Sequence, residues 1–342
     1  MVKISDVAEY AGVSVSTVSR ILSQDETFSA SEDTILKVNE AVSKLGYKPL
    51  RIRKKSKSTK YTLSLIMTVS KEDEELDPYW AEIRVKIVEE ASKNNFTISD
   101  VLHLDEIDKY ELSSDAYIFL GSTSLETLKS LGLEVSNTVI VDNSIINLSG
   151  YDKVTSDLYE ATRLNIDKLI SLGHKEIAFI GGYDIYMDIN THETHTFDAM
   201  RKKAFEEQLR IKGLYKEELV ILGEWRSKHG YEMTKELMSR EIKPTAIITA
   251  SDPLAIGVLH ALRELGLQVP NDISIISYDN IESSEFMSPP LSTVDLNSVE
   301  LGRQSVYLLL QRLEGRKIPV KVIVQSNLIE RESIKDIQGG NS

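Results

Sequence analysis

Short polar runs directly follow several apolar runs of the chain, and their side chains are of the kind that binds a hydroxylated ligand. Four of them stand at positions 142–143 (Asp-Asn), 181–184 (Gly-Gly-Tyr-Asp), 251–252 (Ser-Asp) and 278–280 (Tyr-Asp-Asn). Carboxylates and amides hydrogen-bond to paired hydroxyls. Each Asp taken alone is explained equally well as a helix cap or a loop residue. Four runs at successive strand ends favour one binding site.

Aromatic side chains extend this candidate site. Residues 77–80 (Asp-Pro-Tyr-Trp) begin an amphipathic stretch and offer the rings of Tyr79 and Trp80. An aromatic face stacks on the apolar side of a sugar ring. Trp225 is expected either to stack on the same ligand from the opposite side or to belong to the core.

A second kind of chemistry is indicated near the beginning of the chain. Small hydroxyl residues and one basic residue, Arg20, lie there on one predicted helix. Ser and Thr hydroxyls and a helix N-terminus can contact phosphates, and Arg can donate two hydrogen bonds to guanine O6 and N7. Small side chains also let a helix enter the major groove closely. The residues concerned are Ser14, Val15, Ser16, Thr17, Ser19 and Arg20.

The surrounding pattern predicts a helix-turn-helix followed by a third helix. Ser5 can cap the first helix, and Gly12 can end it in a left-handed conformation. Ser14 is expected to cap the second helix, and Ser29 with Glu32 has the spacing of a capping box for the third. The apolar positions at helical spacing are Ile4, Val7, Ala8, Ala11, Val18, Ile21, Leu22, Ile35, Val38, Val42 and Leu45.

The charge distribution supports contact with nucleic acid at this end. The chain has a net charge of −13, but residues 1–60 hold eleven Lys/Arg and seven Asp/Glu. Residues 48–60 contain seven basic residues and no acidic one. An acidic body repels phosphate, so a basic arm decides where a duplex docks. Arg51, Arg53, Lys54 and Lys55 are therefore expected to contact DNA.

Composition excludes several other classes of protein. With 342 residues the chain is too long for one ordinary domain, and without cysteine it has no disulfide framework and no thiolate zinc site. No apolar run approaches the length that spans a bilayer, and the N-terminus does not resemble a signal peptide. We expect a cytoplasmic, nucleoid-associated bacterial protein that needs no metal and no cofactor.

After residue 60 short apolar strands alternate with amphipathic helices, which predicts an α/β fold with parallel sheets wrapped by helices. Two such units fit the length. The predicted strands are 63–68, 116–120, 138–141, 177–180, 246–249 and 273–277. The predicted helices are 79–94, 158–172, 196–212, 227–239, 252–265 and 299–313.

The head resembles that of the lac/galactose repressor family of bacterial transcription regulators. The resemblance rests on Ala11-Gly12-Val13-Ser14-x-x-Thr17-Val18-Ser19-Arg20 and on Leu45-Gly46-Tyr47-x-Pro49. It continues to about residue 332 through Leu172-Gly173-His174, Arg201-x-x-Ala204-Phe205, Ser251-Asp252-x-x-Ala255, Tyr278-Asp279 and Pro290-Leu291-Ser292-Thr293-Val294.

The resemblance implies specific roles. Val15, Ser16 and Arg20 would read bases, while Ser14, Thr17 and Ser19 would hold phosphates. Arg201 and Asp279 would bind the effector, and Ser251 would line the same pocket, beside Tyr79, Trp80 and Trp225. A homodimer would bind a palindromic operator on double-stranded DNA.

It also implies the domain plan: a helix-turn-helix head (1–47), a basic hinge (48–60), a two-lobed core like periplasmic sugar-binding proteins (61–332) and a polar tail (333–342). The N-lobe would comprise 61–156 and 290–320, and the C-lobe 157–289 and 321–332. The chain would cross between the lobes near Ser156, Pro290 and Val320.

The hinge departs from the family pattern. Arg53 stands near the expected Ala, and Ser56 near the expected Leu, whose paired side chains wedge into the minor groove in the family. Ser cannot make the contacts that offset base unstacking. We therefore expect this hinge to bind mainly through charge, with weaker kinking of the DNA and a steep salt dependence.

The sequence is interpreted as a sugar-responsive repressor. The segment 24–29 and the run 77–84 look most like the galactose-repressor branch of Gram-positive bacteria, which suggests galactose or a β-galactoside as effector. The alternatives are a repressor that answers another sugar or a corepressor, a sugar-binding protein, and a hydrolase. His192 and His195 lack the spacing of a metal motif and are expected in an exposed loop.

Overall fold

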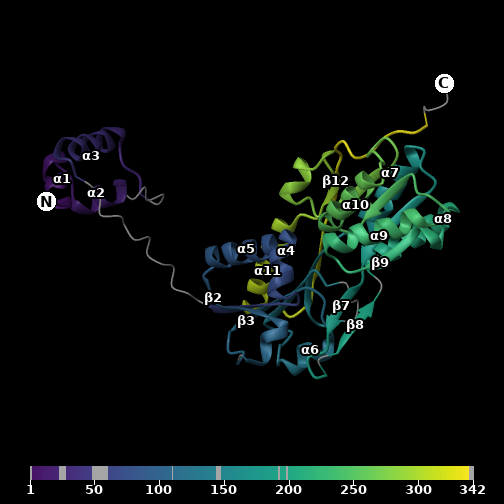
Figure 1. Ribbon diagram of the computed structural model, residues 1–342. Coiled ribbons are helices and arrows are strands. Elements are labelled where there is room, and N and C mark those ends of the chain that lie inside the picture. Colours follow the sequence, from purple (N-terminus) through teal and green to yellow (C-terminus); the bar gives the residue numbers. More distant parts are fainter. Residues whose placement is uncertain are drawn as a thin grey trace. The chain divides into compact units, whose positions relative to one another are not determined.

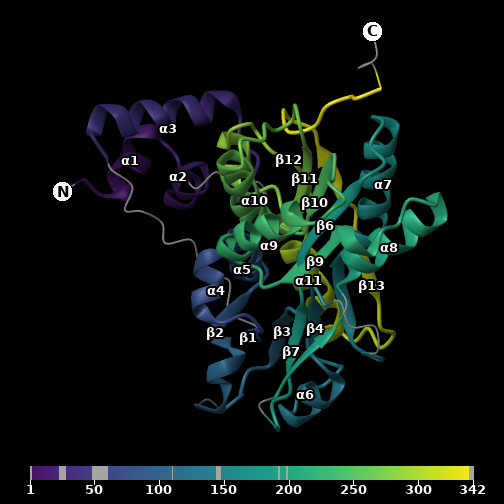
Figure 2. The same ribbon diagram turned by 45° about the vertical axis from the view of Figure 1, so that its right-hand side comes forward.

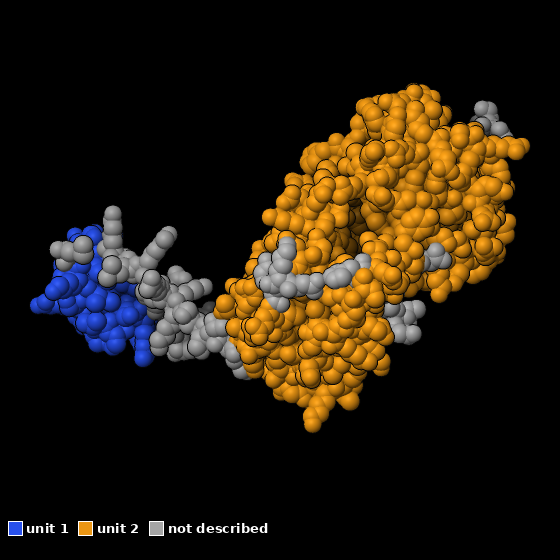
Figure 3. Space-filling view, turned by 60° about the horizontal axis from the view of Figure 1, so that its bottom comes forward, with its two compact units in different colours: residues 1–59 blue, residues 60–342 orange. Residues whose placement is uncertain are grey.

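The computed structural model describes residues 2–22, 28–47, 61–109, 111–143, 148–191, 193–197 and 199–338. They belong to two compact units, residues 1–59 and residues 60–342, traced in Figure 1 and coloured separately in Figure 3. Arg51, Arg53, Lys54 and Lys55, which are predicted to contact DNA, lie outside the described residues.

The first unit consists of three helices around a small apolar core. They are α1 (Ile4–Ala11), α2 (Val15–Leu22) and α3 (Glu32–Leu45). The fully buried side chains of Val7, Val18 and Val38 come one from each helix, so the core needs all three. Gly12 ends α1 in the left-handed region, with φ of 66°, which confirms the predicted turn.

The cap of the first helix differs from the prediction. Ser5 lies inside α1, and the carboxylate of Asp6 accepts a hydrogen bond of 2.8 Å from the backbone N–H of Lys3. A carboxylate in the first turn also interacts favourably with the helix dipole. Asp6 therefore replaces Ser5 as the residue that satisfies this helix start.

The third helix begins two residues later than the proposed capping box. Ser31, and not Ser29, is the N-cap, because its hydroxyl accepts a hydrogen bond of 3.3 Å from the N–H of Thr34. Burial in α3 begins only at Val38, one turn after Ile35, so Ile35 is largely exposed instead of belonging to the buried stripe.

The second unit is built from two sheets, which we call the N-lobe and the C-lobe. The N-lobe sheet is parallel throughout. Its strands, in spatial order, are β13 (Lys321–Val324), β5 (Asp152–Ser156), β4 (Thr138–Val141), β3 (Ala116–Leu120), β1 (Tyr61–Met67) and β2 (Phe96–His103). Its helices are α4 (Lys71–Leu76), α5 (Pro78–Lys93), α6 (Leu125–Ser130) and α11 (Ser298–Leu313).

The C-lobe sheet is parallel except for its edge strand β14, which runs antiparallel to β12. Its strands, in spatial order, are β14 (Asn327–Ile329), β12 (Ser292–Asp295), β11 (Ser274–Tyr278), β10 (Ala246–Thr249), β6 (Ile177–Gly182) and β9 (Val220–Gly223). Its helices are α7 (Leu158–Ser171), α8 (Met200–Lys212), α9 (Ser227–Ser239) and α10 (Asp252–Glu264). The predicted α/β class with parallel sheets is confirmed.

Both faces of the N-lobe sheet are covered, as the continuous apolar strands require. Leu65 and Ile118 belong to the large core that includes residues of α5 and α11. Ile66, Phe119 and their neighbours point to the opposite face and form a separate apolar cluster. We call this second cluster the outer N-lobe core.

Two predicted crossings between the lobes are wrong by several residues. β12 (292–295) pairs in the C-lobe sheet and β13 (321–324) in the N-lobe sheet, so the chain crosses near residues 296–298 and 325–327. Both strands are only four residues long, and which sheet each one joins depends on pairing with distant strands. The crossing after Ser156 agrees with the prediction.

Several segments differ from their predicted structure. Residues 196–197 are the end of a strand, β8 (Thr194–Phe197), so α8 begins at Met200 and not at 196. His195 lies in this strand, where its ring stacks on that of Tyr186. Ser333 is buried and hydrogen-bonded to strand β11, so residues 333–338 pack on the C-lobe instead of forming a tail. Among the described residues no helix combines the length and the apolar character needed to cross a bilayer.

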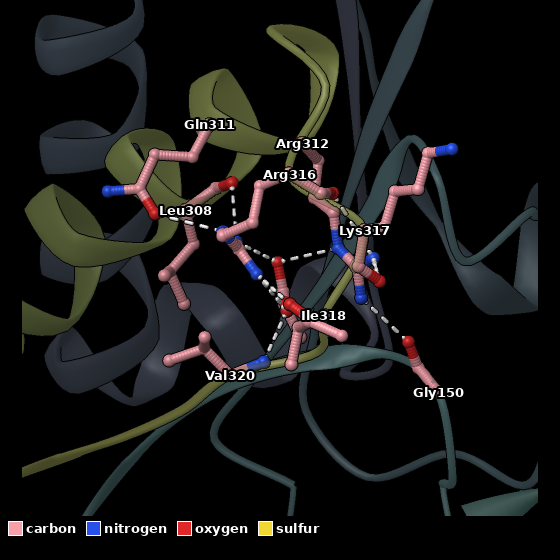
Figure 4. A network of polar contacts seen from close by, with 9 residues as sticks. Gly150, Leu308, Gln311, Arg312, Arg316, Lys317, Ile318 and Val320 are labelled. Atoms are coloured by element: carbon pink, nitrogen blue, oxygen red, sulfur yellow. Dashed lines mark hydrogen bonds and ion pairs between the residues drawn. The ribbon is translucent and has the colours of Figure 1, made fainter.

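A buried ionic network fixes the end of α11 on the N-lobe (Figure 4). Asp152 is inaccessible to solvent and receives hydrogen bonds from Arg312 at 3.0 Å, from Arg316 at 3.0 Å and from the N–H of Val320 at 2.7 Å. Burial alone would raise the pKa of Asp152, but bonds from these cations and the backbone lower it. Arg312 also binds the carbonyl of Gly150 at 2.8 Å, so its guanidinium is well satisfied.

Candidate functional site

The N-terminus of α2 carries a row of exposed hydroxyls. The Ser14 hydroxyl accepts a hydrogen bond of 3.1 Å from the N–H of Thr17, which confirms it as the N-cap. Its oxygen also lies 2.7 Å from that of Ser16 and 2.8 Å from that of Thr17. Three adjacent hydroxyls at a helix N-terminus form a surface suited to a phosphate oxygen.

The remaining predicted DNA-reading residues differ in exposure. Val15 and Arg20 are exposed on α2, and Ser19 is half-buried. The Arg20 guanidinium lies over the ring of Phe28, 5.3 Å from its centroid. This contact restrains the long, flexible side chain of Arg20, which belongs to the same helix as the hydroxyl row.

In the second unit, strand ends from both lobes meet in one polar cluster. Asp142 follows β4 of the N-lobe, and Asp279 and Asn280 follow β11 of the C-lobe. All three have positive φ values, of 52°, 104° and 50° respectively. Such backbone conformations are unfavourable for residues other than glycine and concentrate at functional sites.

Carboxylates outnumber cations in this cluster. Burial raises the pKa of Asp142, and burial together with the nearby carboxylate of Asp77 raises that of Asp279 well above its ordinary value. Burial likewise raises the pKa of Asp77 to about 6. The guanidinium of Arg201 opposes all three increases because it stabilises the charged carboxylates.

Arg201 lies in the first turn of α8 with its guanidinium between two aromatic rings. Its central carbon is 5.4 Å from the ring centre of Trp225 and 5.3 Å from that of Tyr278. The Nε atom of Arg201 and the hydroxyl of Tyr79 are buried, and neither has a hydrogen-bond partner of ordinary length and angle among the described residues. The Tyr79 hydroxyl does lie close enough to the Asp142 carboxylate to influence its pKa. Because buried polar groups are nearly always paired, these two atoms, one from each lobe, indicate a ligand position.

The double glycine at the end of β6 makes room for Trp225. A Cβ atom on Gly182 would lie 2.3 Å from the indole ring, so no other residue fits without moving it. The indole N–H donates a hydrogen bond of 2.8 Å to the carbonyl of Tyr183. Trp225 is therefore half-buried at the cluster. Its ring is positioned by close packing on Gly182 and by the hydrogen bond to Tyr183.

The other predicted residues are placed differently. Ser251 is the N-cap of α10, and its buried hydroxyl accepts a hydrogen bond from the N–H of Leu254 at 3.4 Å. Trp80 is half-buried and packs edge to face against Tyr79, with ring centres 5.3 Å apart. Tyr79, Arg201, Trp225 and Asp279 thus share one cluster, whereas Ser251 serves a helix start beside it.

Two residues of the cluster were not among the predicted site residues. Asp77 caps α5, since its carboxylate accepts a hydrogen bond of 3.2 Å from the N–H of Tyr79, and Pro78 follows at the first helical position. Asp142 was recognised only as part of a polar run after a strand. The signal that could have found both is their position after strands or before a helix at the same sheet edge.

A further buried carboxylate, that of Asp252, holds the neighbouring loop through hydrogen bonds. Asp252 accepts hydrogen bonds from the N–H of Ile281 at 3.0 Å and from the hydroxyl of Thr293 at 2.8 Å. Its own N–H donates to Asp279 at 3.4 Å. Burial raises the pKa of Asp252 to about 6. Asp252 therefore fixes the loop that carries Asp279.

Comparison with known proteins agrees with both units. Residues 3–49 match the family of bacterial regulatory proteins of the lacI family, and residues 166–334 match the periplasmic binding protein-like domain. Among curated proteins the chain is 34% identical to the HTH-type transcriptional repressor MelR of Bacillus subtilis, over 97% of both chains. It is 32% identical to the HTH-type transcriptional regulator GalR of Streptococcus thermophilus, over 98% of this chain and all of the relative.

Solved structures show the same architecture. The transcriptional regulator CelR in complex with cellobiose is 25% identical, with a TM-score of 0.69, over 97% of this chain and all of that one. The lac repressor dimer bound to operator and an anti-inducer is 25% identical, with a TM-score of 0.64, over 98% and 99%. The chain belongs to the lacI family of bacterial regulatory proteins and is a DNA-binding transcription regulator with a periplasmic-binding-protein-like core.

Proposed function

We propose that this protein is a repressor that binds a palindromic operator through α2 and releases it when a small neutral sugar binds between the lobes. The observation that carries the proposal is the buried pair of unsatisfied polar atoms, Arg201 Nε and Tyr79 OH. They come from different lobes and lie with carboxylates and the ring of Trp225. A ligand that joins them would bind both lobes at once.

The charge of the cluster favours a neutral ligand rich in hydroxyls. Asp77, Asp142 and Asp279 interact with one guanidinium, and the raised pKa of each carboxyl indicates that this poorly hydrated site already disfavours negative charge. An anionic ligand such as a phosphate would be disfavoured for the same reason. Hydroxyl groups can donate to the carboxylates and accept from the guanidinium. The ring of Trp225 offers an apolar face to the sugar ring.

Galactose or a β-galactoside is the proposed effector. Support comes from curated relatives with the names GalR and GanR, each 32% identical over nearly the whole chain. The relatives also include MelR and regulators with the name PurR, so the comparison by itself supports the family more firmly than the sugar.

On the DNA side, we propose that two heads of a homodimer place α2 in successive major grooves. Val15, Ser16 and Arg20 would contact base edges. Ser14, Thr17 and Ser19 would contact phosphates, and the basic residues of 48–60 would contact the DNA backbone. Sugar binding would change the relative orientation of the lobes and separate the two hinges. A ligand shifts such an equilibrium only by its difference in affinity for the two states, typically about 1–3 kcal/mol.

The decisive experiment measures binding of the full chain to labelled DNA from upstream of its own gene, with and without galactose, at fixed salt. Release of the DNA by galactose supports both the assignment as a repressor and galactose as the effector. Tight binding that ignores galactose but responds to another member of a sugar panel rejects galactose alone. No specific binding at all rejects the assignment of α2.

Two variants separate the two sites in the same assay. Arg20→Ala should weaken operator binding by about 1–3 kcal/mol and leave sugar binding intact. Asp279→Ala should retain operator binding and lose the sugar response. An Asp279→Ala protein with a normal response would remove this carboxylate from the effector site.

A further inference from the structure

A two-stranded hairpin interrupts the C-lobe between the end of β6 and the start of α8. Its strands are β7 (Asp184–Met187) and β8 (Thr194–Phe197), paired antiparallel as a sheet of their own. Both ends of this hairpin are rooted in the C-lobe, while Figures 1 and 2 show it extending beside α6 of the N-lobe. We call its described residues, 184–191 and 193–197, the strap.

The tip of the strap is anchored in the other lobe. Ile189 is only 8% exposed and belongs to the outer N-lobe core, together with Phe119, Leu128 and Tyr151. The carbonyl of Met187 accepts a hydrogen bond of 3.4 Å from Thr127 in α6. A C-lobe insertion thus contributes a buried side chain to the N-lobe.

The turn of the strap presents Ile189 in a defined way. The N–H of Asp188 donates to the carbonyl of Glu193 at 2.9 Å, and the N–H of Asn190 donates to the Asp188 carboxylate at 2.8 Å. Between the strands, the ring of Tyr186 stacks on that of His195 with centres 5.0 Å apart. These contacts stiffen the hairpin, so a displacement of its tip is passed to its base.

The base of the strap lies at the polar cluster that contains Arg201 and Trp225. The charge of Asp184 acts on Arg201, whose pKa it raises together with Asp279. The carbonyl of Tyr183, the residue before the strap, accepts the indole hydrogen bond of Trp225. Arg201 follows the strap after only three residues, in the first turn of α8.

We propose that the strap ties the two lobes together, with Ile189 as the positioning residue that anchors it. The strap would do so across the region between the lobes that contains Tyr79, Arg201 and Asp279, called here the effector cleft. Any rotation of the lobes has to pull Ile189 out of the outer N-lobe core or move Asp184 and Arg201 relative to Asp142 and Tyr79. Docking of the tip therefore holds the cleft closed and sets the geometry of the ligand groups. The inference rests on the proposed function only in taking this cleft as the effector site.

The chain offers an internal reporter for this test. Its two tryptophans are both half-buried: Trp80 packs against the ring of Tyr79 in the N-lobe, and Trp225 lies against Arg201 in the C-lobe. Emission wavelength and acrylamide quenching of the full chain therefore report opening of the cleft without label or effector. Hydrogen–deuterium exchange of residues 185–196 reports undocking of the strap independently.

Ile189→Asp and Ile189→Ala are the test variants, and Ile189→Leu is the conservative rescue. Ile185→Asp is the matched control, because Ile185 is on the same hairpin but 52% exposed. In both test variants we expect strap amides to exchange about tenfold faster or more, a red-shifted tryptophan emission and stronger quenching. Ile185→Asp and Ile189→Leu should resemble the unmodified protein, and thermal unfolding of each lobe should persist.

Two outcomes would overturn the proposal. If the strap amides exchange faster while tryptophan emission and quenching stay unchanged, the tip is docked but does not hold the cleft. If neither signal changes in Ile189→Asp and Ile189→Ala, Ile189 is not an anchor. Because no effector is used, either result is distinguishable from failure of the proposed sugar or operator.

Discussion

Two arginines with opposite surroundings allow a quantitative test of the effector site. Arg312 is paired with Asp152 and with three carbonyls, so its charge is satisfied within the protein (Figure 4). Arg201 has a buried Nε without a partner among the described residues and lies between the rings of Trp225 and Tyr278. We expect the change Arg→Met, which retains most of the volume, to have opposite effects at the two positions.

At Arg201 the stability terms nearly cancel. Arg201→Met removes an unsatisfied buried donor, which costs about 1–3 kcal/mol in the folded protein. It also removes two cation–π contacts, each worth about 0.5–2 kcal/mol. The net change in the free energy of unfolding should therefore be about 1 kcal/mol or less near pH 6. The loss of hydrogen bonds to a charged group should weaken effector binding by about 1.5–3 kcal/mol, about ten- to a hundredfold.

The pH dependence of this variant has a definite sign. Arg201 lowers the pKa values of Asp142 and Asp279, so without it both carboxyls hold their protons to higher pH in the folded state. A folded state that binds more protons than the unfolded state loses stability as pH rises. Arg201→Met should therefore be more destabilising at pH 8 than at pH 6.

Arg312→Met should behave in the opposite way. It leaves the fully buried Asp152 with one cation fewer and should cost about 3–5 kcal/mol of stability, with effector affinity per folded molecule unchanged. The assay is urea unfolding at pH 6 and 8, together with calorimetric titration of the sugar identified in the operator experiment. If Arg201→Met destabilises as much as Arg312→Met and binds the sugar normally, Arg201 is a structural residue and the reasoning fails.

Three further results are expected. The pKa of Asp252 is raised to about 6 in the folded protein, so the free energy of unfolding should fall as pH rises from about 4 to 6 and then level off. Asp252→Asn should flatten this slope in denaturation curves, and an equal slope in both proteins would contradict the reasoning. Gly182→Ala should displace Trp225, because the new Cβ would meet its ring at 2.3 Å, and should shift tryptophan emission and weaken sugar binding by about tenfold or more; an unshifted emission would refute the packing. Replacing Lys54 and Lys55 by Ala should reduce the slope of log affinity against log salt by about 2 in operator titrations, whereas an unchanged slope would show that the hinge does not bind through charge.

The sequence by itself determined those features that depend on neighbours along the chain. Ser14 and Thr17 are three residues apart, so the cap of α2 could be inferred from spacing alone, and Gly12 marked the turn before it. The apolar runs predicted most central strands because a strand buried on both faces must be apolar throughout. Where two local caps competed, as at Ser5 and Asp6, spacing did not choose between them.

Only the tertiary structure decided which distant residues meet. β12 and β13 are equally short, and their sheets were fixed by pairing with β11 and β5. Asp77 and Asp142 became part of the effector cluster because two lobes bring a helix start and a strand end to the same place. The strap mixes polar and apolar residues without clear periodicity, and its one buried tip residue, Ile189, belongs to a cluster with Phe119 and Leu128, which stand far earlier in the chain. Pairing and packing over such separations depend on the whole fold, so local pattern could not reveal them.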